Sequence, residues 1–149
     1  MTPDERAKAS AEAMWQGDAA SQWLGMTLEN TGEGVAVMSL EVAAHHCNGH
    51  GMCHGGIIFS LADSTFAFAC NSRNQATVAQ HCTISFIAPG RKGDRLTAAA
   101  REVSLTGRSG LYDIRVTNQE GAVIAEMRGM SRAIRGQLFD EDQPGGDPT

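Results

Sequence analysis

Apolar residues recur along this chain with two different periods, and these periods predict one long helix and at least five strands. Residues 34–42 (GVAVMSLEV) alternate apolar and polar positions, as is typical of a strand with one covered face. Residues 55–72 (GGIIFSLADSTFAFACNS) are apolar almost all round a helical wheel, which predicts a helix buried on most sides. Four later segments have strand character: 77–87, 95–104, 110–118 and 122–134.

Two shorter helices are predicted before the first strand. Residues 3–16 form an amphipathic pattern, with Thr2 as a candidate N-cap and Pro3 at the first helical position. The stretch DAASQWLG suggests a second helix capped by Asp18. We assign no chemistry to either.

The links between the last four predicted strands are short and rich in turn residues: APGRKGD, TGRSG and NQEG. Such links join neighbouring strands antiparallel, so we expect these four strands to form a meander, with the early strand or strand pair in the same sheet. One apolar helix facing one antiparallel sheet indicates the α+β class. We therefore expect a hotdog fold, in which the sheet wraps around the central helix.

With 149 residues, the chain has the length of one domain, expected here over residues 1–135. Residues 136–149 hold four acids and no base, and we expect this acidic tail to be disordered. The formal net charge is −5, and removing these four acidic charges leaves −1. The ordered part is therefore nearly neutral.

Composition and charge exclude several classes of function. The chain shows no signal peptide and no apolar run of about 18 residues, so we expect a soluble cytoplasmic protein without membrane association. Its four cysteines form no CxxC pair and are expected to be free thiols. The segment RKGDR at 91–95 could hold the phosphates of a small ligand, but one tyrosine and no known motif argue against nucleic acid.

The stretch CNGHGMCHGG, residues 47–56, raises the question of a metal. Structural zinc sites usually combine two ligand pairs that lie well apart in sequence, whereas the candidate ligands here crowd into one loop. We therefore expect no metal and no other cofactor. The candidate metal ligands in this loop are His45, His46, Cys47, His50, Cys53 and His54.

The glycines of this stretch favour a different chemistry. Gly55 and Gly56 open the predicted long helix, whose first N–H groups lack partners within the helix and carry the positive end of its dipole. Such groups can donate to a polarised carbonyl oxygen, which would make an oxyanion site. Glycine at a helix start also serves capping or packing, and that reading stays open.

Asp63 is the only charged residue between Gly55 and Ser72. A buried carboxylate costs several kcal/mol unless it is compensated, so its presence needs an explanation. It could pair with a distant arginine or face a subunit interface. Together with the glycine-rich helix start, however, a carboxylate that acts as base or nucleophile is the minimum equipment for acyl transfer to water.

Three segments, NGHGMCHGGIIFSLADSTFAFACNS, CTISFIAPGRKGD and GLYDIRVTNQEG, closely resemble the hotdog acyl-CoA thioesterases of phenylacetic acid degradation, over roughly residues 15 to 135. The resemblance implies hydrolysis of aryl-acyl-CoA thioesters, with hydroxylated phenylacetyl-CoA preferred. It also implies a homotetramer built from hotdog dimers, with active sites at the dimer interface.

The resemblance extends to individual residues. It implies that Asp63 is the catalytic carboxylate, that Gly55 donates its N–H to the thioester oxygen, and that Asn48 orients substrate or water. Asp63 of one subunit would face Asn48 and Gly55 of another. Some relatives carry a hydroxyl one turn after the carboxylate, where this chain has Ala67. Further candidates for substrate binding are His54, Arg91, Lys92 and Arg108. Of these, the two arginines and the lysine are expected to hold the CoA phosphates.

Two alternative functions remain. A hotdog hydratase or dehydratase would need a histidine paired with an acid, for which His54 or His81 could serve. A non-enzymatic module that binds acyl-CoA or a metal would leave Asp63 with a structural role. The combination of Asn48, Gly55 and Asp63 favours hydrolysis.

Overall fold

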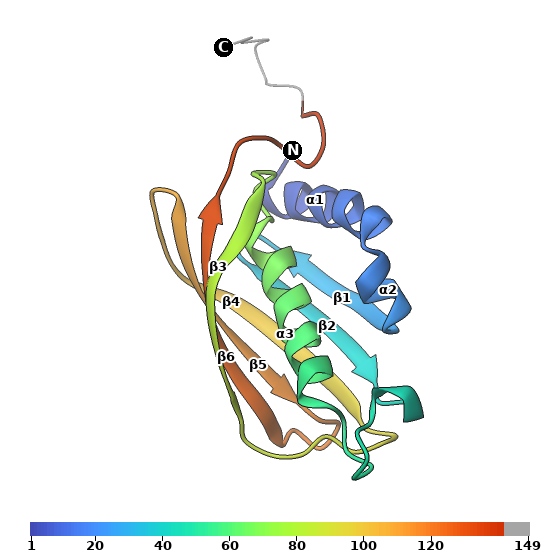
Figure 1. The fold of residues 1–149 in the computed structure, drawn as a ribbon. Coiled ribbons are helices and arrows are strands. Elements are labelled where there is room, and N and C mark those ends of the chain that lie inside the picture. Colours follow the sequence, from blue (N-terminus) through green and yellow to red (C-terminus); the bar gives the residue numbers. More distant parts are fainter. Residues whose placement is uncertain (142–149) are drawn as a thin grey trace.

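The computed structural model describes residues 1–141, and its main feature is a six-stranded antiparallel sheet curved around one long helix (Figure 1). This is the predicted α+β hotdog arrangement. The strands are β1 (Met26–Gly32), β2 (Val35–Glu41), β3 (Thr77–Phe86), β4 (Arg95–Thr106), β5 (Ser109–Thr117) and β6 (Val123–Ala133). The helices are α1 (Pro3–Gly17), α2 (Ala19–Trp23), the short 3₁₀ helix η1 (Ala44–His46) and the central α3 (Gly55–Cys70).

The two N-terminal helices begin where the sequence predicts. The Thr2 hydroxyl accepts a hydrogen bond from the Glu5 N–H (3.1 Å), and the Glu5 carboxylate accepts one from the Thr2 N–H (2.9 Å). This reciprocal pair is a capping box that satisfies two N–H groups at the helix start. Asp18 caps α2 by accepting from the Ser21 N–H (3.0 Å). No helix in residues 1–141 is long and apolar enough to cross a membrane.

Helix α3 packs one face against the sheet. Phe66 and Leu61 are completely buried there, and a Cβ at Gly129 of β6 would fall 2.8 Å from the Phe66 ring, so glycine lets that ring lie against the strand. The expectation of burial on most sides holds for only part of the helix. Its opposite face is half-exposed and includes Ile57, Phe59, Ser60, Asp63 and Ser64.

The order of strands corrects the predicted four-strand meander. The sheet runs β1-β2-β4-β5-β6-β3, so only β4, β5 and β6 form a meander. Strand β3 pairs with β6 at the far side of the sheet, and β4 pairs with β2. As a consequence β1 and β3 are the two edge strands, and β3 has one edge that no other strand of residues 1–141 covers.

The link 87–94 explains this order, because it crosses the end of the sheet instead of turning back on β3. It first stays on β6 through two hydrogen bonds to the Ile124 carbonyl (2.8 and 3.2 Å). It then passes the start of α3, where the Cys53 N–H donates to the Gly90 carbonyl (2.7 Å), and reaches the residue after β2 through the Gly93 N–H (2.8 Å). The crossing therefore brings residues 87–94 beside the loop that precedes α3.

The chain after β6 returns to the first helix. Asn74, a buried residue with a left-handed φ of 59°, accepts hydrogen bonds from the Leu138 and Phe139 N–H groups (2.9 and 3.2 Å). Arg6 donates to both carboxylate oxygens of Glu141, with distances of 2.9 and 2.7 Å to Oε2. Residues 136–141 of the predicted tail thus lie against the domain. The remaining tail residues fall outside the described part, and the disorder expected there stays a prediction.

Candidate functional site

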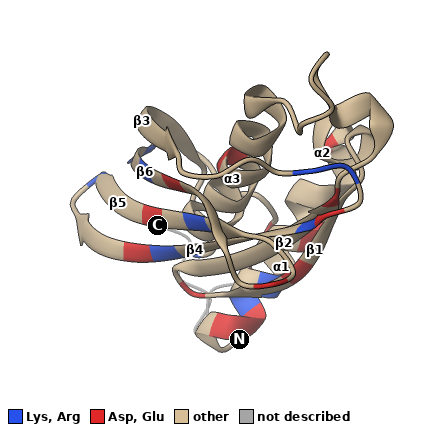
Figure 2. Cartoon of the chain, turned by 90° about the horizontal axis from the view of Figure 1, so that it is seen from below, with Lys and Arg blue, Asp and Glu red and all other residues tan. Residues whose placement is uncertain are grey.

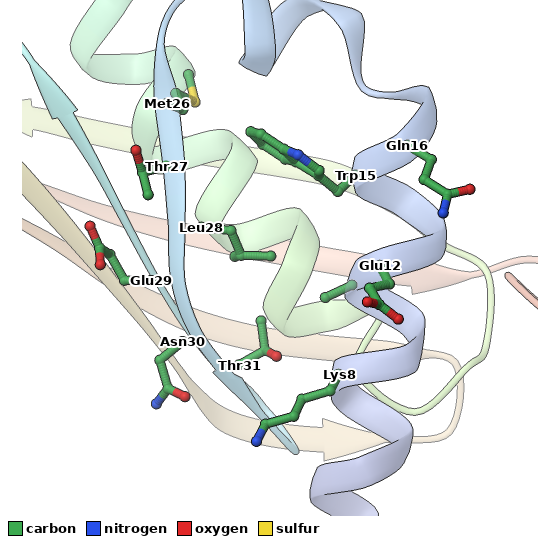
Figure 3. A pocket seen from close by; sticks show the side chains of 11 residues that line it. Lys8, Glu12, Trp15, Gln16, Met26, Thr27, Leu28, Glu29, Asn30 and Thr31 are labelled. Carbon is green, nitrogen blue, oxygen red and sulfur yellow. The ribbon is translucent and has the colours of Figure 1, made fainter.

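Two of the hollows on the surface of residues 1–141 are compared with the predicted site residues. The larger, of about 970 Å³, lies between α1 and the edge of β1, and Trp15, Leu28 and Glu12 line it (Figure 3). None of the residues predicted to bind or convert substrate lies there. The smaller hollow, of about 340 Å³, lies at the start of α3, and Asn48 and Gly55 line it. We therefore place the candidate site in the smaller hollow, because it contains the predicted chemistry.

The first turn of α3 leaves one backbone donor available. The Gly56 N–H donates to Nδ1 of His54 (2.9 Å), and the N–H groups of Ile57 and Ile58 donate to the His54 carbonyl (2.9 and 3.2 Å). Among the described residues no acceptor faces the Gly55 N–H. This group is the one donor of the first helical turn that remains free for a ligand, and it carries the positive end of the helix dipole.

Asn48 supplies a second donor to the same hollow. Its side-chain oxygen accepts hydrogen bonds from the backbone N–H groups of His50 (2.9 Å) and Met52 (3.3 Å). These two bonds fix which end of the amide points into the loop, and they leave the NH₂ end as a donor. Asn48 and Gly55 therefore each bring an N–H donor to the same hollow.

Asp63 lies apart from these donors. It follows Gly55 by eight residues in the same helix, which corresponds to about 12 Å along the axis. The carboxylate makes no hydrogen bond or ion pair with any residue of the described chain, and burial raises its pKa. A distant arginine partner, one alternative for this residue, is absent from residues 1–141. Asp63 is half-buried. Figure 2 shows an acidic position in red on α3.

The basic candidates fall into two groups. Arg91 forms an isolated bridge with Met52, which places the link of Arg91 and Lys92 beside the hollow, and both residues are exposed. Arg108 lies in the β4–β5 hairpin, at the far end of β4. This strand begins at Arg95, directly after the link 87–94 that borders the hollow, and its other end is roughly 36 Å away. One protomer thus brings Arg91 and Lys92 to the site but leaves Arg108 far from it. The three phosphate assignments stay predictions.

Two of the loop histidines have local structural roles. His54 caps α3 through Nδ1, and it does not line the hollow. His46 is buried, and its ring bonds to the Ala43 N–H (2.9 Å) and the Leu24 carbonyl (2.7 Å). Within the described residues no three His, Cys, Asp or Glu side chains gather as metal ligands. Neither His54 nor His81 is hydrogen-bonded to an acid within these residues of one protomer.

Sequence reasoning missed most of the wall of the hollow. Its apolar lining comes largely from the end of β3 and the link after it, which only the tertiary fold brings to the start of α3. The additional lining residues are Met52, Cys53, Ile58, Phe86, Ile87, Ala88 and Pro89. The one available signal is the run FIAP, an apolar extension of a strand into a turn.

A hotdog sheet, a free N–H at the start of its central helix and a lone carboxylate two turns later together define a hydrolase of the thioester-cleaving class. The chain belongs to the thioesterase superfamily, whose family model matches residues 50–125. It is 44% identical to the acyl-coenzyme A thioesterase PaaI of Escherichia coli over 136 residues, which are 91% of this chain and 97% of that protein.

Solved structures give the same result. The structure of E. coli PaaI matches with a TM-score of 0.90 and 43% identity, over 91% of this chain and 99% of the other. A variant of PaaI from Thermus thermophilus matches with a TM-score of 0.74 and 35% identity, over 76% and 97%. A hypothetical thioesterase from Streptococcus pneumoniae in complex with coenzyme A matches with a TM-score of 0.72 and 25% identity, over 76% and 90%.

Proposed function

We propose that this protein is an acyl-CoA thioesterase that hydrolyses aryl-acyl-CoA thioesters, hydroxylated phenylacetyl-CoA or a close relative, to the free acid and CoA in phenylacetate catabolism in the cytoplasm. The observation that carries the proposal is the pair of donors on one hollow, the Gly55 N–H and the Asn48 amide. The similarity to E. coli PaaI, named as an acyl-CoA thioesterase, supports the substrate class.

The Gly55 N–H and the Asn48 amide would bind the thioester carbonyl oxygen. As the carbonyl carbon becomes tetrahedral, negative charge develops on that oxygen, and donors held in place stabilise it more strongly than they stabilise the substrate. The bonds that orient Asn48 and cap Gly56 exist without substrate, so the donors need little rearrangement. Removing one such donor typically lowers kcat by a factor of about 10²–10³.

The carboxylate would come from a second protomer. Asp63 cannot reach a carbonyl bound at Gly55 of its own chain, because the two positions are about 12 Å apart along α3. A two-fold axis at the free edge of β3 would place two sheets edge to edge and two α3 helices antiparallel, so that Asp63 of one chain faces the helix start of the other. The exposed side chains of Val78, Phe86 and Ile87 support β3 as the contact surface.

In this composite site Asp63 would either deprotonate a water molecule that attacks the thioester or attack the carbonyl itself. In the first route the hydroxide adds to carbon, the tetrahedral intermediate collapses, and the C–S bond breaks with release of the CoA thiolate. In the second route the Asp63 carboxylate adds to the carbonyl carbon, the C–S bond breaks with release of the CoA thiolate, and an acyl-carboxylate anhydride is left. Water then cleaves this anhydride to the free acid and the Asp63 carboxylate. No cofactor is needed in either route, and CoA enters as part of the substrate.

The outer face of the sheet supports a further level of assembly. Arg101, Asp113 and Arg128 occupy neighbouring positions on β4, β5 and β6, and Asp113 forms ion pairs with both arginines. Figure 2 shows basic and acidic positions in blue and red on these strands. Two dimers that meet through such a charged, self-complementary face would give the expected homotetramer.

A panel of acyl-CoA esters, followed by release of the CoA thiol, tests the proposed function. We expect phenylacetyl-CoA and its ring-hydroxylated forms to be turned over with a higher kcat/KM than acetyl-CoA or long-chain acyl-CoA. Absence of thiol release from every ester, with the protein folded and oligomeric, would contradict the proposal. Preference for a straight-chain ester would contradict the aryl part alone.

A further inference from the structure

The loop that carries Asn48 has a cysteine at each end. Cys47 and Cys53 face each other in an isolated antiparallel bridge, and both are free thiols. Hydrogen bonds of 2.8 Å flank the bridge, one from the Asn48 N–H to the Met52 carbonyl and one from the His54 N–H to the carbonyl preceding Cys47. Because these bonds belong to the neighbouring residues, the two cysteines form a non-hydrogen-bonded pair, whose side chains lie on the same face.

This kind of pair has the spacing of a disulfide. The Cα atoms of a non-hydrogen-bonded antiparallel pair are about 4.5 Å apart, and disulfides join Cα atoms about 4.4–6.8 Å apart. The present contacts of the thiols are weak, at 3.5 Å from Cys47 Sγ to the Ala43 carbonyl and 3.8 Å from Cys53 Sγ to the His54 carbonyl. A bond between the two sulfurs therefore needs rotation of side chains rather than displacement of backbone.

The two thiols differ in accessibility. Cys47 is half-buried, whereas Cys53 is only 5% exposed. Burial raises the pKa of Cys53 to about 11, and the nearby Cys47 thiol adds to this shift. Cys47 is therefore the thiol that a dissolved reagent meets first, and Cys53 is placed to resolve the product.

We propose that Cys47 and Cys53 form a thiol–disulfide exchange site for low-molecular-weight disulfides, and that closing it reversibly inactivates the enzyme. The Cys47 thiolate attacks the reagent RSSR, which breaks its S–S bond and releases one RS⁻. Cys53 then loses its proton and attacks Cys47 Sγ in the mixed disulfide, which releases the second RS⁻ and forms the Cys47–Cys53 bond. The dithiol is thereby oxidised by two electrons, and one RSSR is reduced to two RSH.

The effect on activity rests on the proposed function, because it acts through the same hollow. Cys47 directly precedes Asn48, and Cys53 itself lines the hollow two residues before Gly55. A bond between the sulfurs fixes the two ends of the loop relative to each other. Forming this bond turns the Cys53 side chain, which is part of the wall of the hollow, toward Cys47 and so changes the surface that positions the thioester against Asn48 and Gly55. Errors near 1 Å in the position of a reacting group cost about 10²-fold in rate.

The experiment uses the full chain, reduced and then incubated with glutathione disulfide. We expect the intact mass to fall by about 2 Da and two of the four thiols to disappear. We also expect kcat/KM to fall at least about threefold and to recover with dithiothreitol. The variants Cys47→Ser and Cys53→Ser should show neither the mass loss nor the loss of two thiols, and reduced Cys47→Ser should keep the wild-type activity.

A matched control removes the other two cysteines. The double variant Cys70→Ala/Cys82→Ser should behave like the wild type, since it retains the proposed pair. A stable glutathione adduct without the 2 Da loss, or the same loss in Cys47→Ser, would overturn the exchange site. Full oxidation without any change in activity would overturn the inactivation. Mass and thiol count do not depend on turnover, so failure of the proposed function would be seen separately.

Discussion

Asp63 is the residue on which the proposed chemistry depends most directly. The substitution Asp63→Asn keeps the size and most of the hydrogen-bonding capacity of the side chain but removes its charge and basicity. We expect kcat to fall by about 10²–10⁴, with KM nearly unchanged, because a general base or nucleophile acts in the chemical step. Steady-state thiol release measures both constants. A variant that keeps wild-type turnover, or loses it only by dissociating, would return Asp63 to a structural role.

The same substitution has an expected effect on stability that depends on pH. Burial raises the pKa of Asp63 in the folded state above its unfolded value. At a pH between the two pKa values, Asp63 is ionised in the unfolded chain but still protonated in the folded one. The free energy of unfolding therefore falls as pH rises through this range, and it stays lower at higher pH. Asp63→Asn should therefore raise Tm at pH 7, and the gain should vanish below the unfolded pKa. Thermal unfolding at pH 7 and pH 3.5 checks this, and a larger gain at the lower pH would contradict it.

Arg91 and Lys92 lie beside the hollow and make no ion pair with the described residues. If they contact the CoA phosphates, they bind far from the reacting carbonyl and contribute equally to ground state and transition state. Arg91→Ala and Lys92→Ala should then raise KM more than they lower kcat, and weaken the salt dependence of KM. Arg115→Ala, on the outer face of the sheet, is the matched control. Equal effects of all three variants on KM would remove Arg91 and Lys92 from the site.

The residue types of the candidate site are readable from the sequence, but its shape is not. Asp63 is conspicuous because it is the only charge in an apolar helix, and Gly55 because it opens that helix. His54 caps the helix through a hydrogen bond from the Gly56 N–H to Nδ1, and the sequence does not determine the rotamer that makes this bond. The wall from Phe86 to Pro89 depends on where the link 87–94 runs, and this is a long-range property of the fold.

The start of α3 allows a test at the level of a single element. Gly55 is the first helical residue, where proline is well tolerated, and His54 before it already has the extended backbone (φ −59°, ψ 136°) that proline requires. Gly55→Pro should therefore keep the helix and delete the N–H, lowering kcat by about 10²–10³. Gly55→Ala adds a similar Cβ, 3.3 Å from the Phe86 ring, but keeps the donor.

The difference between the two Gly55 variants measures the donor itself. Gly55→Ala should lose much less activity than Gly55→Pro, and both should show the helical circular dichroism of the wild type. Equal losses in the two variants would assign the effect to crowding against Phe86 and contradict the role of the N–H group.

The ends of helices that are set by nearby capping residues can be predicted from the sequence, whereas the pairing of strands cannot. The caps at Thr2 and Asp18 act within three residues, so the helix starts can be predicted. The position of β3 beside β6 depends on hydrogen bonds from the link 87–94 to residues far away in the chain. A short link resembles a hairpin turn in sequence even when it crosses a sheet, and this explains the wrong meander.

At the scale of the whole molecule, a site shared by two protomers predicts complementation. Asp63→Asn and Asn48→Ala should each be inactive alone. In a mixed dimer, one of the two sites carries both changes and the other carries neither. Random reassociation at equal amounts should then restore about a quarter of the wild-type activity, since half of the dimers are mixed. A mixture without activity, with subunit exchange shown by mass, would contradict the composite site and require a site within one chain.

The path of the link 87–94 also bears on how such a protein changes over generations. Under the proposed function, the groups that break the thioester lie on α3 and the loop before it, while most of the apolar wall comes from the contiguous positions 86–89. Neighbouring codons therefore encode much of the surface that selects the acyl or pantetheine part, separately from the reactive groups. Drift or selection in this short stretch can change substrate preference while the hydrolytic chemistry is inherited intact.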